Sequence, residues 1–408
     1  MVRVGVMSRG RPSLRRLKMF DAVVKSGTIG RAAAEMGLAQ PTVTFGLTKL
    51  EAEVGEPLLA RGPGGSSPTP AGLILHLRVD RMLRQIEAAA ARLFDADEAH
   101  KASIVVRNLT GAQVRDHLAV DAAGSFRAAA IALKVAEPTL SRSVRQLRDM
   151  VSTPLYRRTS VGFTTTAAGA RFASELRVAL SEIDQALDEL VAARGAGNGR
   201  ISMGCLPLMP KHPLVETVSG IIRSYPGVQI SLSEDAYAPL IKALRDGALD
   251  LVLGAMRDDT DDEFVNVPLF ADPFVLVVRK DHPLKSDVPL DDAELAELSW
   301  IVPWRDTPRR LHLEALFSRL PKRPHVVIET SSLTMTMAVL EESNCITLLA
   351  QSQFAMEAGD QRLRILQAKA NSHRRTVGII CRRDWLATIV QSAFLESLIA
   401  NGRKHAAQ

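Results

Sequence analysis

The sequence predicts a multidomain protein in which two similar helical domains precede a larger α/β half. Three observations support this prediction. Residues 22–72 recur as residues 119–169 at a constant offset of 97 residues, and such a repeat fixes the architecture before any local pattern does. The length of 408 residues is enough for roughly two to four domains. From residue 200 onward, short apolar strands alternate with amphipathic helices, which is typical of α/β folds.

Each copy of the repeat predicts three short helices, of which the third is the best defined. It begins at a proline, whose fixed φ suits a first helical turn, at Pro41 in the first copy and Pro138 in the second. Apolar residues at helical spacing then form a buried stripe. The stripe consists of Val43, Leu47, Leu50 and Val54 in the first copy and of Leu140, Val144, Leu147 and Val151 in the second.

The outward face of each third helix carries short hydroxyl and basic side chains. In the first copy these are Thr42, Thr44, Phe45, Thr48 and Lys49, and in the second Thr139, Ser141, Arg142, Arg145 and Arg148. This pattern favours a helix-turn-helix whose third helix lies in the major groove of DNA, since an arginine side chain can donate two hydrogen bonds to the edge of one guanine. A Pro-Leu turn and further arginines follow, namely Arg61 in the first copy and Arg157 and Arg158 in the second. The alternative is the solvated face of an ordinary helical bundle.

The positive charge of the chain is concentrated in the repeated part. Residues 1–200 contain 28 lysines and arginines and 19 acidic residues, whereas residues 201–408 contain 23 and 26. A basic half joined to a slightly acidic half is expected when a nucleic-acid-binding module is linked to a module with another role.

The motif GSFRAAAIALKVAEPTLSRSVRQLRDMVSTPLYRRTSVGFTTTAAG, residues 124–169, resembles the winged helix-turn-helix of the LysR-type transcriptional regulators. Residues 27–72 resemble a more divergent version, although the family normally has one such unit. The resemblance implies two winged helix-turn-helix domains, at 12–72 and 110–169, with DNA contacts from the outward residues of each third helix and from the arginines after each Pro-Leu turn. The wing of the second copy is expected at 159–166.

The two copies are expected to differ in their role. Phe45 and Gly46 replace Arg142 and Ser143, and a glycine inside a helix costs about 1 kcal/mol relative to alanine. The glycine-rich wing at 62–68 also looks flexible. We therefore expect the second copy to dominate sequence-specific binding. The first copy could extend the site, read a weaker element or serve mainly in assembly.

A long helix is predicted after each wing, at 73–100 and 170–195. Apolar residues in each alternate at spacings of four and three, which is typical of a coiled-coil seam. The seam residues are Val79, Leu83, Ile86, Ala90 and Leu93 in the first helix and Leu176, Leu180, Ile183, Leu187 and Leu190 in the second. Each stripe could pack on its own domain, but the resemblance favours a homodimer or homotetramer formed through the helix at 170–195. The glycine-rich residues 195–199 are expected to form a hinge.

Residues 200–400 resemble the effector domain of the same family, which is similar to periplasmic solute-binding proteins. The stretches YPGVQISL, ALRDGALDLVLG and PLFADPFVLVVRKDHPL carry the resemblance. It implies two α/β subdomains, one at about 200–267 with 372–400 and the other at about 268–371. Parallel sheets covered on both faces are expected, with a small-molecule effector in the cleft between the subdomains.

Three loops are expected to line this cleft. The first is apolar, which argues against a strongly anionic grip there, and contains Cys205, Leu206, Pro207 and Leu208. The second offers a ring for stacking and a cation for pairing with an anion, and contains Trp304, Arg305 and Thr307. The third begins a helix and contains Thr330, Ser331 and Ser332. Trp304 could instead belong to the core, and the serines could merely cap a helix.

Together with these patterns, the resemblance implies a transcriptional regulator that binds double-stranded promoter DNA under the control of a small metabolite, with RNA polymerase as a further partner. Catalytic, metal and cofactor motifs are not found, so an enzyme is disfavoured. Cys205, Cys345 and Cys381 form no CxxC pair, and the N-terminus has no apolar signal core, which together favour the cytoplasm over export or a membrane. A transport-type solute receptor fits only the C-terminal half. A ligand-independent protein that bridges distant DNA sites is the remaining alternative.

Overall fold

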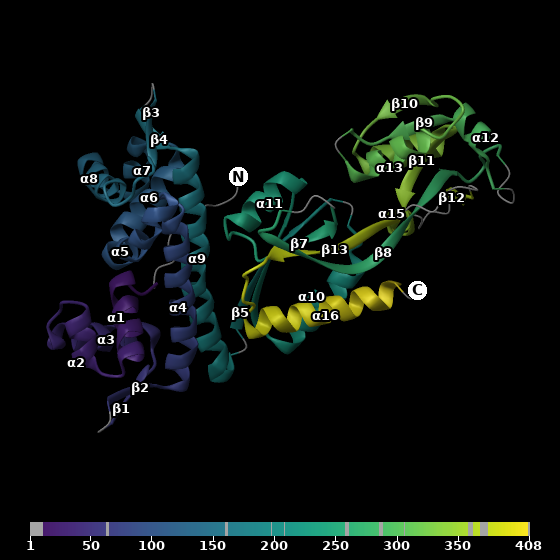
Figure 1. Cartoon of the computed structure of the whole chain (residues 1–408). Coiled ribbons are helices and arrows are strands. Elements are labelled where there is room, and N and C mark those ends of the chain that lie inside the picture. The colour runs from purple at the N-terminus through teal and green to yellow at the C-terminus, as the bar shows by residue number, and fades with distance from the viewer. Residues whose placement is uncertain are drawn as a thin grey trace. The chain divides into compact units, whose positions relative to one another are not determined.

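The computed structural model divides the chain into two compact units, Met1–Arg200 with Arg245–Ala248, and Ile201–Leu244 with Leu249–Gln408 (Figure 1). The structure describes residues 11–62, 65–159, 162–196, 198–207, 209–257, 261–284, 289–305, 307–357, 362–367 and 374–406. Among these residues, every helix is too short or too polar to cross a lipid bilayer.

The first unit contains the same succession of elements twice. The first copy consists of α1 (Leu14–Ser26), α2 (Ile29–Glu35), α3 (Gln40–Val54), β1 (Leu59–Gly62), β2 (Gly65–Pro68) and α4 (Pro70–Ala91). The second consists of α6 (Gly111–Ala123), α7 (Phe126–Leu133), α8 (Glu137–Arg148), β3 (Tyr156–Thr159), β4 (Gly162–Thr165) and α9 (Ala167–Val191). A short connector, η1 (Ala96–Lys101) and α5 (Ala102–Asn108), lies between them. Val151 falls beyond the end of α8 and is only half-buried, unlike the other stripe residues.

The first wing, which the sequence analysis expects at 62–68, contains a two-stranded hairpin. β1 pairs antiparallel with β2, with Leu59 opposite Pro68 and Ala60 opposite Ser67. Gly65 adopts a φ of 125°, which glycine reaches readily, and this lets the chain turn back into β2. The N–H of Ser66 also donates to the carbonyl of Gly27, 2.8 Å away. Pro63 and Gly64 lie outside the described residues.

The start of each long helix is held in the same way in both copies. The hydroxyl of Thr69 accepts from the N–H of Gly72 at 3.0 Å, and that of Thr166 accepts from Gly169 at 3.0 Å. An added Cβ would lie 2.0 Å from the Leu58 carbonyl oxygen at Gly72 and 2.2 Å from the Leu155 carbonyl oxygen at Gly169. The repeated glycines therefore allow the first turn of each helix to lie directly against the backbone just before the first strand of its wing.

We expect Gly169→Ala to lower the free energy of unfolding by about 1–3 kcal/mol, because a backbone carbonyl must move to admit the methyl group. Gly30→Ala is the matched control, since its Cβ would meet only the Gln40 side chain at 3.9 Å. Urea denaturation of the full chain measures both variants. Equal stability of the two would contradict the close approach.

The apolar stripes of α4 and α9 pack into one core that spans both copies. This core includes Val79, Met82 and Ile86 from α4 and Leu176 and Ile183 from α9. The sequence analysis expects each apolar stripe to pack either on a second chain, as in a coiled coil, or on its own domain. In the structure, the facing element of each helix is instead the corresponding helix of the other copy.

The second unit is built on a mixed sheet of nine strands. Its strands are β5 (Asn198–Cys205), β6 (Gly227–Glu234), β7 (Leu251–Ala255), β8 (Phe264–Arg279), β9 (Ser299–Val302), β10 (His325–Glu329), β11 (Cys345–Ala350), β12 (Leu363–Leu366) and β13 (Arg374–Arg382). The order is β10-β9-β11-β8-β13-β7-β5-β6, with β12 also paired to β8. The expectation of purely parallel sheets is wrong, because β8 and β13 run antiparallel to their neighbours.

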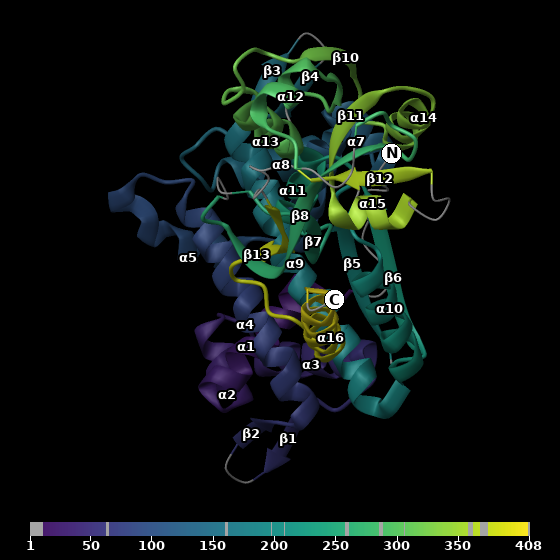
Figure 2. The ribbon, with the colours of Figure 1, turned by 90° about the vertical axis from the view of Figure 1, so that its right-hand side faces the viewer.

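Helices cover this sheet: α10 (His212–Ser224), α11 (Tyr237–Arg245), α12 (Asp292–Glu297), α13 (Pro308–Phe317), α14 (Leu333–Glu342), α15 (Gln351–Glu357) and α16 (Ile389–Ala406). α10 and α16 lie side by side, and the Asn401 amide donates to the Thr217 hydroxyl at 3.0 Å (Figure 2). The buried apolar residues fall into separate clusters. Two clusters contain only residues of 201–270 and 377–398, and two others contain only residues of 274–366.

Candidate nucleic-acid interface and effector site

α8 presents an exposed basic face. Leu140, Val144 and Leu147 are buried, which turns Thr139, Arg142, Arg145 and Arg148 outward and leaves Ser141 half-buried. Arg148 pairs with Asp149 at 2.6 Å. Within the described residues, the side chains of Arg142 and Arg145 form no ion pair or hydrogen bond. Two solvated guanidinium groups one helical turn apart are suited to bonding base edges or phosphates.

The wing of the second copy extends this surface. β3 pairs with β4, and Arg157 and Arg158 are exposed on β3. Phe163 of β4 packs its ring 5.5 Å from that of Phe126 at the start of α7. This contact holds the wing against α7, so the backbone that carries Arg157 and Arg158 has a defined position relative to the helices.

α3 presents a less basic face. Thr42, Phe45, Thr48 and Lys49 are exposed and Thr44 is half-buried, as predicted. The Lys49 ammonium lies 5.6 Å from the centre of the Phe45 ring. Arg61 lies in β1 opposite Ser66, and its side chain is outside the described part of the structure.

Gly46 has a packing reason that the sequence pattern does not reveal. A Cβ at this position would meet the Met19 sulfur of α1 at 2.6 Å. The glycine therefore lets α1 and α3 approach closely, and it does not only weaken the helix.

A buried polar group holds the second copy together beneath the wing. His117 of α6 is fully buried, with Nδ1 2.6 Å from the Tyr156 hydroxyl and Nε2 3.0 Å from the Gly169 carbonyl oxygen. Burial lowers the pKa of His117 to about 4, so the ring is neutral. Burial also raises the pKa of Tyr156, which keeps its hydroxyl protonated and able to donate.

We expect the protein to lose stability in acid through His117. The folded-state pKa of about 4 lies below the ordinary value of 6.5, so protonation favours the unfolded chain as the pH falls from 6.5 toward 4. Between pH 7 and pH 5 the loss is about 2 kcal/mol. His117→Gln should flatten this dependence in denaturation curves, whereas His212→Gln, at an exposed position, should not. Identical pH profiles for the wild type and His117→Gln would contradict this role.

In the second unit, two of the three predicted effector loops lie side by side. They follow the parallel strands β9 and β10, and the N–H of Thr330 donates to the Val302 carbonyl at 2.9 Å. Trp304 is 59% exposed, so it is not a core residue, and Arg305 is exposed. Thr307 and Ser332 cap α13 and α14 by accepting from the N–H of Arg310 and Met335. Ser331 is exposed beside them.

The first predicted loop follows β5, which four strands separate from β9 in the sheet order. Cys205 is buried, and burial raises the pKa of its thiol to about 12, so the thiol stays protonated. Leu206 packs over Gly254, Pro207 is exposed, and Leu208 lies outside the described residues. A hollow of about 560 Å³ is lined by Ala296, Glu297 and residues 322–326, and it contains none of the predicted effector residues.

Arg309 is a candidate site residue that the sequence patterns missed. It is half-buried at the start of α13, directly after the second loop. Its Nη1 has no hydrogen-bond partner within the described structure. Burial, and then the charge of Arg375, lower its pKa to about 10, so the guanidinium stays charged. Arg375 itself is paired with Asp272 at 2.8 Å.

The neighbouring Arg310 has a structural role. It is buried, and it donates to the Pro303 carbonyl at 2.8 Å and to Glu314 at 2.7 Å. The adjacent arginines thus differ, since Arg310 anchors the second loop while Arg309 presents an unpaired cation beside it. An anion is the expected partner of such a cation.

This fold and these surfaces define a DNA-binding protein with a separate ligand-binding half. The family model of the LysR substrate binding domain matches residues 194–403. The family model described as bacterial regulatory helix-turn-helix protein, lysR family, matches residues 14–73 and again residues 112–170. The chain therefore belongs to the LysR-type family, and it is a DNA-binding transcriptional regulator with an effector-binding domain.

Two named relatives agree with this assignment, the first of them over nearly the whole length of the chain. The HTH-type transcriptional regulator GalR of Pseudomonas putida is 27% identical over 92% of this chain and 94% of its own. The DNA-binding transcriptional dual regulator OxyR of Escherichia coli is 30% identical over 42% of this chain and 56% of its own. A full-length OxyR variant from Pseudomonas aeruginosa has the same fold, with a TM-score of 0.52, 19% identity, and coverage of 72% of this chain and 95% of that chain.

Proposed function

We propose that both copies of the repeat are winged helix-turn-helix units that contact promoter DNA, at 12–72 and 110–169, and that the protein acts in the cytoplasm, where DNA is accessible. The observation that carries the proposal is the exposed basic face of α8 with its unpaired Arg142 and Arg145. The second copy supplies most of the specificity through Thr139, Ser141, Arg142, Arg145, Arg157 and Arg158. The first copy contributes Thr42, Thr44, Phe45, Thr48, Lys49 and Arg61.

The effector site lies beside the second and third loops and includes Trp304, Arg305, Thr307, Thr330, Ser331 and Ser332. We add Arg309 to this set because its charge has no partner among the described residues. From the apolar first loop, Cys205, Leu206 and Pro207 complete the site from the subdomain at about 200–267 and 372–400, and Leu208 is included on the sequence pattern alone. The separate apolar clusters at the two ends of β8, one with Leu269 and Phe270 and the other with Phe274 and Leu276, support two subdomains.

Selection of bound genomic DNA fragments by the purified full chain tests the regulator function. The expected result is a defined DNA motif near promoters. Its occupancy should change when substrates or products of the enzymes encoded by the neighbouring genes are added. Binding to DNA without any motif, and without a response to small molecules, would instead favour a protein that bridges distant DNA sites.

Arg309→Ala is expected to weaken effector binding about tenfold or more if the effector is an anion. A panel of small carboxylic acids identifies binders as compounds that raise the melting temperature of the wild type, because a ligand of the folded state stabilises it. The rise should be lost in Arg309→Ala and kept in Arg319→Ala, which removes an exposed cation just beyond the C-terminal end of α13. An unchanged rise in Arg309→Ala would remove this residue from the site.

A further inference from the structure

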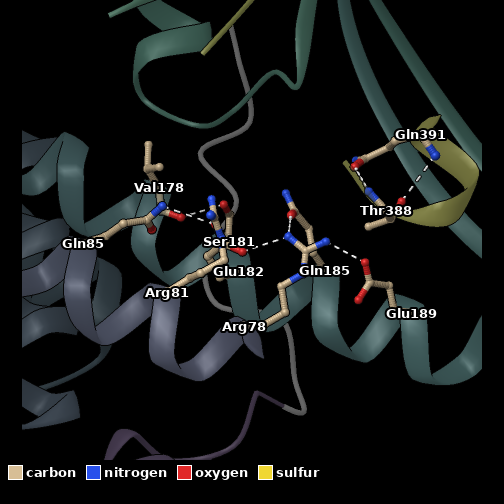
Figure 3. Close-up of polar contacts among 10 residues, drawn as sticks. All are labelled: Arg78, Arg81, Gln85, Val178, Ser181, Glu182, Gln185, Glu189, Thr388 and Gln391. Atoms are coloured by element: carbon tan, nitrogen blue, oxygen red, sulfur yellow. Dashed lines mark hydrogen bonds and ion pairs between the residues drawn. The ribbon is translucent and has the colours of Figure 1, made fainter. Parts of the chain in front are cut away.

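α4 and α9 pair in antiparallel orientation through a buried set of charged side chains (Figure 3). Arg78 is fully buried and donates to Glu182 at 2.8 Å, to Gln185 at 2.7 Å and to Glu189 at 2.6 Å. Arg81 also reaches Glu182, at 3.1 Å. Farther along the pair, Arg92 bonds Glu175 at 2.9 Å. Residue numbers that rise along α4 are therefore paired with residue numbers that fall along α9, as expected for antiparallel helices.

These contacts follow the 97-residue offset of the repeat. Arg78 corresponds to Glu175, and Arg92 corresponds to Glu189, so the ion pairs Arg78–Glu189 and Arg92–Glu175 occupy equivalent positions. Gln85 and Glu182 also correspond, and they meet each other at the centre at 3.3 Å. The two copies are therefore related by an approximate twofold axis through this point. The wings β1–β2 and β3–β4 lie at opposite ends of the helix pair (Figure 1).

The charges on the two helices are segregated. α4 and its C-cap carry Arg78, Arg81, Arg84 and Arg92 against Asp80 and Glu87. α9 carries Glu175, Glu182, Asp184, Asp188 and Glu189 against Arg171 and Arg177. In the same geometry, two copies of α4 would set Arg78 against Arg92 twice. Two copies of α9 would set Glu175 against Glu189 twice and bury Glu182 against itself, which is costly.

The connector holds both copies to the same helix pair. Ala102, Val105 and Leu109 are buried in the core that contains Ala89 and Ala90 of α4. Lys18 of α1 donates to the carbonyls of Leu109 and Arg107 at 2.7 and 3.2 Å. At the end of α4, the Leu93 carbonyl accepts from the N–H of Thr153 at 3.0 Å. The connector between the two copies is thus packed against both copies of the same chain.

We infer that a single chain supplies both halves of the DNA-reading pair, and that the charges of α4 and α9 restrict this pairing to one helix of each kind. It follows that α3 and α8 read two unlike DNA elements as one rigid unit. This second statement rests on the proposed function, whereas the pairing itself does not. The face used by the two helices is then unavailable for pairing between chains, and larger assemblies form through other surfaces.

Zero-length carbodiimide cross-linking of the full chain tests the pairing without DNA. The variant Arg92→Lys places an amine beside Glu175, and the reagent joins an amine to a carboxylate only when the two are in contact. The expected product is a peptide linking positions 92 and 175 in the band of single-chain mass. The control Arg92→Lys/Glu175→Gln should lack this peptide. Recovery of the link only at twice the mass, or its absence from all bands, would overturn the inference.

Selection of random DNA duplexes by the full chain tests the functional consequence. The expected motif contains two unlike elements, of which Arg142→Ala/Arg145→Ala relaxes one and Thr48→Ala/Lys49→Ala the other. An inverted repeat whose two arms relax together in either variant would overturn the reading of unlike elements by one chain. If no motif is selected while the intrachain link forms, the proposed function fails and the pairing stands.

Discussion

The double substitution Arg142→Ala/Arg145→Ala should reduce the affinity for the preferred DNA site by about 1–3 kcal/mol for each arginine that bonds a base edge. Both side chains are exposed on α8, and within the described residues no acidic group competes for them. Removal therefore deletes contacts made only in the complex and should leave the fold intact. Titration of labelled duplexes that carry the selected site and a scrambled site measures the effect.

A charge-matched control separates recognition from general attraction to DNA. Arg84→Ala/Lys322→Ala also removes two cations, both on exposed positions that pair with Asp80 and Glu297. It should lower binding to both duplexes slightly and to the same extent, because it changes only the net charge of the protein. If the α8 variant weakens both duplexes equally, its arginines contact phosphates and do not read the sequence.

The substitution Arg78→Ala should lower the free energy of unfolding by about 3–5 kcal/mol. It leaves the carboxylate of Glu182, which is 4% exposed, without its closest cation, and it opens a gap between α4 and α9. Arg81→Ala is the matched control, because that side chain bonds the same carboxylate but is 22% exposed. It should cost about 1 kcal/mol.

The double variant Arg78→Met/Glu182→Met provides a second check. It removes both buried charges at similar volume, and such replacements are often neutral or stabilising. Stability close to the wild type, together with a large loss in Arg78→Ala, is the expected pattern in denaturant titrations. A small loss in Arg78→Ala would mean that water or another side chain replaces the guanidinium.

Much of the first unit follows from local sequence. The prolines that open α3 and α8 and the stripes Val43, Leu47 and Leu140, Val144 predict these helices, because capping and helical periodicity depend on near neighbours. The outward residues follow from the same periodicity. Burial of Gly46 against Met19 could not be predicted, since it depends on how α1 crosses α3.

In the second unit, local sequence patterns predict most strands but not their full lengths or directions. β7, β9, β10 and β11 are short apolar runs of the kind that the alternating pattern after residue 200 predicts. β8 is much longer than its apolar core at 274–278, because Pro268 and Pro273 interrupt the pattern while pairing with β13 continues. Its antiparallel direction depends on where the chain returns, which periodicity does not encode. Arg309 was missed for a similar reason, because its unusual pKa arises from burial and from Arg375, a residue remote in sequence.

The partner of each long helix was likewise beyond the sequence pattern. A seam of alternating spacing identifies an apolar face but not what covers it, and a partner chain, the same domain and the other copy all satisfy it. The charged residues distinguish these three alternatives only when the register between α4 and α9 is known, because the pairing of Arg78 with Glu189 becomes apparent only after the two helices are aligned.

The common core of α4 and α9 has a consequence for how the protein responds to its own abundance. Two binding units joined by separate chains come apart on dilution, so their combined affinity falls when few copies are present. Units held in one core meet at an effective concentration that does not depend on the number of molecules in the cell. A cell that makes only a handful of these chains would still have every one of them ready to occupy DNA.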